Sequence, residues 1–220
     1  MKFIVAIDGT SASGKSTTAT NVAKKLGWLY LDTGAMYRAI AYYVLKKKVD
    51  PHDEENVVRL LDEIDLRIEM NNGQRTIVNG EDVTEKIRTP EIDRAVTPVC
   101  QFKKVREKMV ELQRKIADNR EIICEGRDMG SVVFPDAQVK VFMDASIDER
   151  AKRRLRDLQK KGINITFEEV KNDLLRRDKE DSTRSEAPLK ISKGAIFIDT
   201  TNLTIEMQTA LVIEEIRKKI

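Results

Sequence analysis

Histidine is almost absent from this 220-residue sequence, which contains only His52. His52 follows Asp50 and Pro51 and precedes an acidic run, a pattern typical of a solvated turn before a helix. A metal site with several histidine ligands is therefore excluded. Only reactions that need no histidine remain open.

Cysteine is also scarce. The two cysteines, Cys100 and Cys124, form no CxxC pair, which argues against a disulfide framework and against a zinc site. Both have apolar neighbours, so we expect them to be buried as small hydrophobic side chains. Free thiols of this kind suit a reducing compartment.

Long apolar runs are missing as well. No run approaches the roughly 18 residues that a membrane-spanning helix needs. The first run, from Phe3 to Ile7, is broken at Asp8, which is too early for a signal peptide and is typical of a buried strand. We therefore expect a cytoplasmic protein that does not engage a membrane.

The sequence also lacks a large imbalance between basic and acidic residues. The 40 basic and 37 acidic residues leave a net charge of +3, which is too small to indicate a nucleic-acid partner. The length corresponds to one domain, and a chain of this size can bury about 70% of its unfolded surface. We expect a monomer that folds without disulfides or a structural metal.

Strand and helix patterns alternate along the chain. Apolar runs typical of buried strands lie at 3–7, 28–31, 121–124, 138–143 and 195–198. Helical patterns lie at 15–26, 34–47, 54–63, 90–118, 146–161, 166–180 and from 204 onward, and four of these helices have a capping residue in Thr33, Ser146, Thr166 and Thr204. The alternation predicts an α/β fold with a doubly wound, five-stranded parallel sheet.

One stretch departs from this alternation. Extended runs at 65–70 and 75–78 are separated by Asn72-Gly73, and Asn79-Gly80 follows the second run. Asn-Gly between extended runs is the strongest local signal for a hairpin. The sequence therefore predicts a small antiparallel insert within the α/β chain.

A phosphate-binding motif follows the first strand. Residues 9–16, GTSASGKS, match G-x-x-x-x-G-K-[ST] without deviation, between a strand and a helix as the motif requires. The amides of the loop would surround phosphates, Lys15 would reach the β- and γ-phosphates, and Ser16 would bind Mg²⁺. The residues expected to bind ATP here are Gly9, Thr10, Ser11, Ala12, Ser13, Gly14, Lys15, Ser16 and Thr17. Phosphoryl transfer depends on positioning and charge, so it needs no histidine.

Arginines are concentrated in the last third of the chain, at Arg150, Arg153, Arg154, Arg156, Arg176, Arg177 and Arg184. They could belong to a solvated helix that pairs them with nearby acids. Beside an intact phosphate loop, however, a lid that closes arginines over nucleotides is the better interpretation, because guanidinium groups match phosphate oxygens in a bidentate geometry.

Three segments are expected to converge on one edge of the sheet. Gly9, Asp32 and Glu125 each follow a predicted strand, and ligands of open parallel sheets bind at the carboxyl ends of the strands. Thr33 and Tyr37, close to Asp32, also have an ordinary explanation as a cap and as a core residue.

These residues resemble the cytidylate kinase family, the CMP and dCMP kinases among the nucleoside monophosphate kinases, over nearly the whole chain. Besides the phosphate loop, the resemblance rests on residues 31–38 (LDTGAMYR), 81–89, 126–137 and 177–184. Three positions differ from the usual family pattern. Thr33 and Thr97 stand where serine is frequent, and Glu125 stands where aspartate is common.

The resemblance implies roles for matching positions. Thr97, Arg106 and Asp128 would read the cytosine edge, Thr33 and Asp181 would hold the ribose, and Arg38, Arg127, Arg177 and Arg184 would surround the monophosphate and sugar. Arg153 and Arg154 would belong to a lid over ATP, and Lys15, Arg127 and Arg184 would be catalytic. Such a base site is chemically sound, since aspartate accepts from the cytosine amine while arginine and threonine donate to the ring acceptors.

The resemblance also implies how the chain is divided. The core would comprise residues 1–33, 86–145 and 187–220, the monophosphate-binding region about 34–85, and the lid about 146–186. Two other functions remain open at this point: another small-acceptor kinase on the same scaffold, such as an adenylate or shikimate kinase, and a nucleotide-regulated or nucleic-acid-binding module without enzymatic activity.

Overall fold

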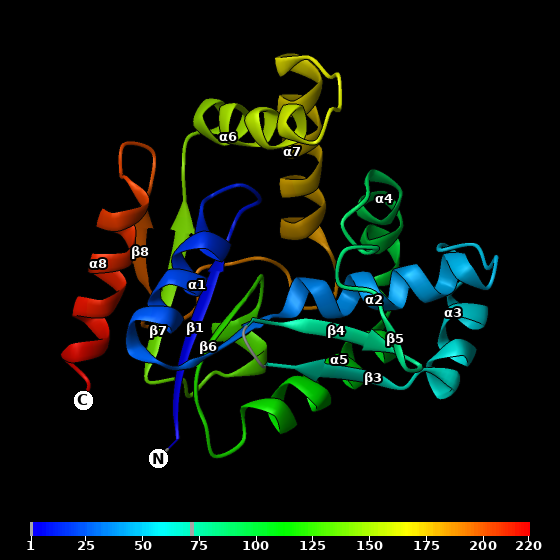
Figure 1. Cartoon of the computed structure of the whole chain (residues 1–220), viewed down its shortest axis with the longest axis horizontal. Helices are drawn as coiled ribbons and strands as arrows, with labels where there is room; N and C mark the ends of the chain where they lie inside the picture. The colour runs from blue at the N-terminus through cyan, green and yellow to red at the C-terminus, as the bar shows by residue number, and fades with distance from the viewer. Residues whose placement is uncertain (1, 71–72) are drawn as a thin grey trace.

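A five-stranded parallel sheet forms the centre of the computed structural model, which describes residues 2–70 and 73–220 (Figure 1). The strands lie in the order β2-β6-β1-β7-β8, so the chain winds outward from β1 in both directions. This confirms the predicted doubly wound sheet. The strands are β1 (Phe3–Gly9), β2 (Leu29–Asp32), β6 (Glu121–Gly126), β7 (Val139–Asp144) and β8 (Ile196–Asp199).

Helices cover both faces of this sheet, and alternate residues of β1 explain why. Phe3, Val5 and Ile7 pack against α1 (Lys15–Leu26) and α8 (Ile205–Arg217) on one face. Ile4 and Ala6 belong to a second hydrophobic core with α2 (Thr33–Lys46), α4 (Pro90–Val99) and α5 (Lys103–Ala117). The continuous apolar run of β1 thus serves two cores, as in other parallel sheets buried on both faces.

The predicted insert is a three-stranded antiparallel sheet, β3 (Leu66–Glu69), β4 (Arg75–Val78) and β5 (Glu81–Asp82). Asn79 and Gly80 form the two-residue turn between β4 and β5, with φ of 49° and 80°. Two successive residues with positive φ favour Asn-Gly, as predicted. The other expected turn, Asn72-Gly73, involves Asn72, which lies outside the described residues.

The stretch 90–118 was predicted as one helical segment, and the structure divides it into α4 and α5. Pro98 removes one hydrogen bond from the last turn of α4, and the chain leaves the helical conformation at Phe102, whose ψ is 125°. The break frees the carbonyl of Cys100, which accepts a hydrogen bond from Arg106 Nη1 at 3.2 Å. The interruption therefore brings α4 and the first turn of α5 to the same site.

The remaining elements lie around the carboxyl edge of the central sheet. Helices α6 (Ile147–Lys160) and α7 (Phe167–Thr183) stand over the ends of β1 and β7, while α3 (Glu54–Leu60) lies beside the small sheet (Figure 1). Short helical turns, η1 (Leu61–Glu63) and η2 (Met129–Val133), complete the chain. Across residues 2–70 and 73–220, none of the helices has both the length and the apolar character needed to cross a membrane.

The predicted caps hold at three of four helices. Ser146, Thr166 and Thr204 each accept a hydrogen bond from the backbone amide three residues ahead, and Thr166 and Glu169 form a complete capping box. At α2 the prediction was wrong, because Asp32 rather than Thr33 is the cap and its carboxylate accepts from the Ala35 amide at 2.9 Å.

Candidate functional site

The phosphate loop curls tightly between β1 and α1. A side chain at Gly9 would place its Cβ only 2.0 Å from the carbonyl oxygen of Met143 on β7, so a residue without a side chain is required there. Gly14, at the entry to α1, has φ of 92°. Ala12, at the tip of the loop, also has a left-handed backbone with φ of 61°.

Lys15 lies folded over this loop. Its ammonium group donates to the Thr10 carbonyl at 2.9 Å, and the Ser13 hydroxyl donates to the same oxygen at 3.0 Å. Burial lowers the pKa of Lys15 to about 7, and the positive charge of Arg127 acts in the same direction. An anionic phosphate beside Lys15 would oppose both effects, so the loop is suited to a negatively charged ligand.

Glu125, at the end of β6, is hydrogen-bonded on both oxygens. Ser16 Oγ donates to Oε2 at 2.8 Å, and the Tyr30 hydroxyl donates to Oε1 at 2.6 Å. Burial is the largest of the effects that raise the pKa of this carboxyl, and Asp32 adds to it. The result is a cluster of hard oxygen atoms directly beside the phosphate loop.

Asp32 and Thr33 occupy the neighbouring strand end. The Asp32 carboxylate caps α2 and also pairs with Arg88 Nη2 at 2.6 Å. Thr33 is already part of the helix, and its hydroxyl donates across to the carbonyl of Glu125 at 2.7 Å. That bond links the start of α2 to β6 and explains why Thr33 is not the cap.

A cavity of about 280 Å³ opens beside the loop and Glu125. Its wall includes Lys15 and Ser16 of the loop. All nine residues expected to bind the acceptor line it: Thr33, Arg38, Thr97, Arg106, Arg127, Asp128, Arg177, Asp181 and Arg184. They come from α2, α4, α5, α7 and the segment after β6, so the fold gathers residues that are far apart in the sequence.

A buried ion pair lies at the inner end of this cavity. Arg106 on α5 pairs with Asp128, and their side chains are only 6% and 4% exposed. The Arg106 guanidinium also lies 5.5 Å from the ring centre of Tyr37. Buried polar groups of both hydrogen-bonding kinds are therefore fixed in the cavity wall, which suits recognition of a polar ring edge.

Arginines line the remaining wall, and acids hold most of them. Arg38 and Arg154 both pair with Asp93 of α4, at 2.6 Å and 2.8 Å. Arg127 Nε pairs with Asp181 of α7 at 2.7 Å. These pairs orient positive groups toward a common space while limiting their mutual repulsion.

A second cavity, of about 450 Å³, lies on the other side of the loop. Gly14, Thr17 and Arg153 line it, and Arg153 donates to the carbonyls of Ser13 and Thr200 at 3.3 Å and 2.7 Å. Arg154 is instead part of the first cavity, because consecutive residues of a helix point about 100° apart. The two arginines that sequence reasoning treated together are thus on different sides.

Sequence reasoning missed several residues of the first cavity. Arg88, Tyr37, Cys100 and Glu180 line it without having been assigned to it. Cys100 is partly exposed there rather than fully buried as expected, whereas Cys124 is fully buried. Arg88 lies within a segment that carried the family resemblance, which was the available signal. Its pairing with Asp32 joins residues too far apart in the sequence to be inferred from spacing.

Asp8, just before the loop, is a further buried acid. Its carboxylate accepts from the backbone amides of Met129 and Gly130 at 2.7 Å and 2.8 Å. Burial raises its pKa to about 6, although these two hydrogen bonds oppose the shift. Asp8 therefore fixes the start of η2, immediately after Asp128 of the first cavity.

Comparison with known proteins gives a consistent picture. The family model for cytidylate kinase matches residues 5–219. The cytidylate kinase of Caldanaerobacter subterraneus is 47% identical over 214 residues, covering 97% of this chain and 94% of that protein. That of Bacillus subtilis is 44% identical over 219 residues, covering 99% and 98%. An uncharacterised protein from Eubacterium ventriosum shares the fold, with a TM-score of 0.56 at 14% identity over 99% of both chains.

Proposed function

Because this chain belongs to the cytidylate kinase family, we propose that its two cavities hold the two substrates of that reaction on either side of the phosphate loop. The protein is an ATP-dependent nucleoside monophosphate kinase that converts CMP or dCMP to the diphosphate, with release of ADP. The observation that carries the proposal is the first cavity, where nine acceptor-binding candidates meet Lys15 and Ser16 of the loop.

The division of roles follows from the positions of the cavities. ATP would occupy the second cavity, with its phosphates in the loop and Arg153 beside it. The acceptor would occupy the first cavity, with its base at the buried Arg106–Asp128 pair and its phosphate among Arg38, Arg127 and Arg184. Asp181 would bind the sugar while retaining its pair with Arg127.

Base selection would rest on Thr97, Arg106 and Asp128. The Asp128 carboxylate can accept from the exocyclic amine of cytosine, while Arg106 and Thr97 can donate to its ring acceptors. A base that leaves one of these buried groups unpaired would lose about 1–3 kcal/mol of binding free energy per group. The high burial of Asp128 and Arg106 supports that penalty.

Phosphoryl transfer itself needs no general base, because a nucleoside monophosphate is mostly a dianion at neutral pH. An acceptor oxygen would form a bond to the γ-phosphorus of ATP while the bond from that phosphorus to the bridging oxygen of ADP breaks. Lys15, Arg127 and Arg184 would stabilise the charge on the transferred group. This chemistry agrees with a site in which arginine is abundant and histidine takes no part.

The oxygen cluster beside the loop fits Mg²⁺. The Ser16 hydroxyl and the Glu125 carboxylate are hard donors, and Mg²⁺ favours a few such ligands together with phosphate oxygens and water. Ser16 would hold the ion, with Glu125 orienting the Ser16 hydroxyl. When bound, the ion would neutralise negative charge on the ATP phosphates.

We also propose that residues 34–85 and 146–186 move relative to the core, as a monophosphate-binding region and a lid that exclude water from the bound substrates. The enzyme would act in the cytoplasm as a monomer. Two free cysteines support a reducing compartment. The presence of both cavities within one chain supports a monomer.

A coupled assay of ADP release tests the proposed function. CMP, dCMP, UMP and AMP would be compared at equal concentrations, and CMP or dCMP should be turned over fastest. Fastest turnover with AMP would overturn the assignment of the acceptor.

A Lys15→Ala variant should lose kcat by orders of magnitude in the same assay, comparable with the roughly 10³–10⁵-fold effect of a phosphate-stabilising arginine.

A further inference from the structure

Arg150 joins the phosphate loop to helix α7 through a partly buried ion pair. We propose that Arg150 is a positioning residue which, together with Asp178, makes the binding of ATP and of the acceptor nucleotide interdependent. The proposal rests on the proposed function, because it takes the loop as the ATP site and α7 as part of the acceptor site. It concerns a contact that lies outside both cavities.

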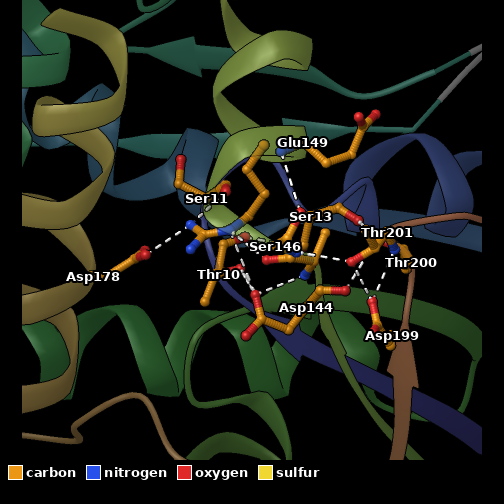
Figure 2. Close-up of polar contacts among 12 residues, drawn as sticks. Thr10, Ser11, Ser13, Asp144, Ser146, Glu149, Asp178, Asp199, Thr200 and Thr201 are labelled. Carbon is orange, nitrogen blue, oxygen red and sulfur yellow. Dashed lines mark hydrogen bonds and ion pairs between the residues drawn. The ribbon is translucent and has the colours of Figure 1, made fainter. Parts of the chain in front are cut away.

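The guanidinium of Arg150 contacts three separate parts of the fold. Its Nε donates to the Ala145 carbonyl at 2.9 Å, just beyond β7. Its Nη1 donates to the Ser11 carbonyl of the loop at 3.3 Å and pairs with Asp178 Oδ2 of α7 at 2.7 Å. In Figure 2, Asp178 points from α7 toward the loop residues Thr10 and Ser11.

Asp178 belongs to α7, the helix that carries several of the residues expected to bind the acceptor. Asp178 directly follows Arg177, and Asp181 and Arg184 follow within two turns. All three of these neighbours line the first cavity. A displacement of α7 at Asp178 would therefore move the three side chains expected to hold the sugar and phosphate.

On the other side, Arg150 contacts the tip of the phosphate loop. Ser11, whose carbonyl binds Arg150, directly precedes Ala12. Ala12 packs against an apolar cluster of Ala151 from α6 with Val170 and Leu174 from α7. The loop tip thus meets the α6–α7 pair through a polar and an apolar contact, and a change in the tip on phosphate binding would act on both.

The burial of Arg150 makes its pair with Asp178 favour one position of α7 relative to the loop. The side chains of Arg150 and Asp178 are 6% and 21% exposed, and the second oxygen of Asp178, Oδ1, is a buried atom with no hydrogen-bond partner among the described residues. Asp178 therefore depends on Arg150 for its charge partner at this position. A shift of α7 away from the loop would separate the buried Arg150 guanidinium from its closest carboxylate partner, which is costly, so the pair favours one placement of the helix.

Energetic coupling between two sites is reciprocal and typically changes affinity 5- to 150-fold. If Arg150 transmits it, ATP in the loop tightens acceptor binding and the acceptor tightens ATP binding by the same factor. Without the Arg150–Asp178 pair, each nucleotide would still bind to its own site. The factor by which one nucleotide tightens the binding of the other would fall toward one. A residue that merely stabilises the fold would not have this signature.

The test is titration calorimetry of CMP binding, with and without saturating β,γ-imido ATP and Mg²⁺. The ratio of the two dissociation constants is the coupling factor. We expect at least a 5-fold factor for the wild type, and less than 2-fold for Arg150→Gln and for Asp178→Asn, with the CMP constant measured alone changed less than 3-fold. The double variant should match the single ones, because both remove the same interaction.

Lys171→Gln is the matched control. It removes an exposed ion pair, Lys171 to Asp148 at 2.7 Å, that joins α7 to α6 without touching the loop. Its coupling factor should equal that of the wild type. A wild-type factor near one, or an unchanged factor in a folded Asp178→Asn protein, would overturn the proposal. A wild-type protein that neither binds nor phosphorylates CMP would instead overturn the proposed function.

Discussion

Asp128 is buried beside Arg106 at the inner end of the first cavity, where it should read the base. Asp128→Asn keeps an acceptor oxygen but removes the negative charge that holds Arg106 in place. We expect KM for CMP to rise roughly 5- to 150-fold, equivalent to about 1–3 kcal/mol, while KM for ATP changes less than 2-fold. Steady-state kinetics with each substrate varied in turn provides the measurement. Equal weakening of both substrates would rule out a role confined to the base.

Asp8 gives the protein a pH-dependent stability. Its folded pKa of about 6 lies above the ordinary value of 3.8, because burial outweighs the two backbone hydrogen bonds. The folded protein therefore binds more protons than the unfolded chain between pH 3.8 and 6. The contribution of Asp8 to the free energy of unfolding should decrease as the pH rises through this window, by up to about 3 kcal/mol.

Asp8→Asn, which does not titrate, isolates this contribution. Urea unfolding of both proteins from pH 4 to pH 7 measures the difference in free energy between wild type and variant. We expect this difference to move against the wild type as the pH rises to about 6 and then to level off. Movement in favour of the wild type would mean that the bonds from Met129 and Gly130 dominate over burial.

Most individual roles at the site depend on pairings that a sequence does not reveal. The loop residues were identifiable because their chemistry is contained in one contiguous motif. The pairs Tyr30–Glu125 and Arg88–Asp32 join distant parts of the chain, so they cannot be predicted from the spacing of these residues in the sequence. The nine acceptor-site candidates were found through family resemblance, not through geometry that the sequence could supply.

At the scale of elements, the close approach of β1 to β7 at Gly9 permits a sharp test. A Cβ there would lie 2.0 Å from the Met143 carbonyl, so Gly9→Ala must push two central strands apart. We expect a loss of at least 2 kcal/mol, or roughly 4–8 °C in Tm for a chain of this size. Differential scanning calorimetry measures both quantities.

Gly194→Ala is a suitable comparison for this variant. Gly194 has a positive φ of 75°, but apart from its chain neighbours no atom of the described residues lies within 4 Å of the position a Cβ would take. Only the backbone strain of about 1–2 kcal/mol should appear there. Equal losses at Gly9 and Gly194 would show that steric contact with β7 contributes nothing.

Elements with strong local signals were predicted well. Helix 15–26 and strand 75–78 have the bounds seen in the structure, and the capping box at Thr166 begins α7. The division at Cys100 was missed because the apolar pattern continues on both sides of the break. The end of α7 was predicted too early, at Glu180. The last turn of the helix is polar, and part of it lines the first cavity instead of packing into a hydrophobic core.

For the whole molecule, the closure that we propose for residues 34–85 and 146–186 would reduce its size in solution when both substrates are bound. The α6–α7 pair stands above the central sheet, and the small sheet lies beside it, on the right in Figure 1. We expect the radius of gyration from small-angle X-ray scattering to fall when CMP and β,γ-imido ATP are both added. An unchanged scattering curve at saturating concentrations would argue against closure.

The overall topology was predictable from the sequence, whereas the shape of the cavities was not. Five apolar runs alternating with helices leave few arrangements other than a parallel, doubly wound sheet. The cavity walls, in contrast, depend on how α4 turns into α5 and how α7 lies over the loop, and both follow from tertiary contacts such as Arg106–Cys100 and Arg150–Asp178.

A crystal structure with CMP and β,γ-imido ATP bound together would show directly whether both nucleotides meet beside the phosphate loop. We expect the triphosphate within Gly9–Ser16 and the CMP phosphate among Arg38, Arg127 and Arg184, with the cytosine against Asp128. A structure in which those arginines face away from a shared cleft, or in which CMP occupies the second cavity, would contradict it.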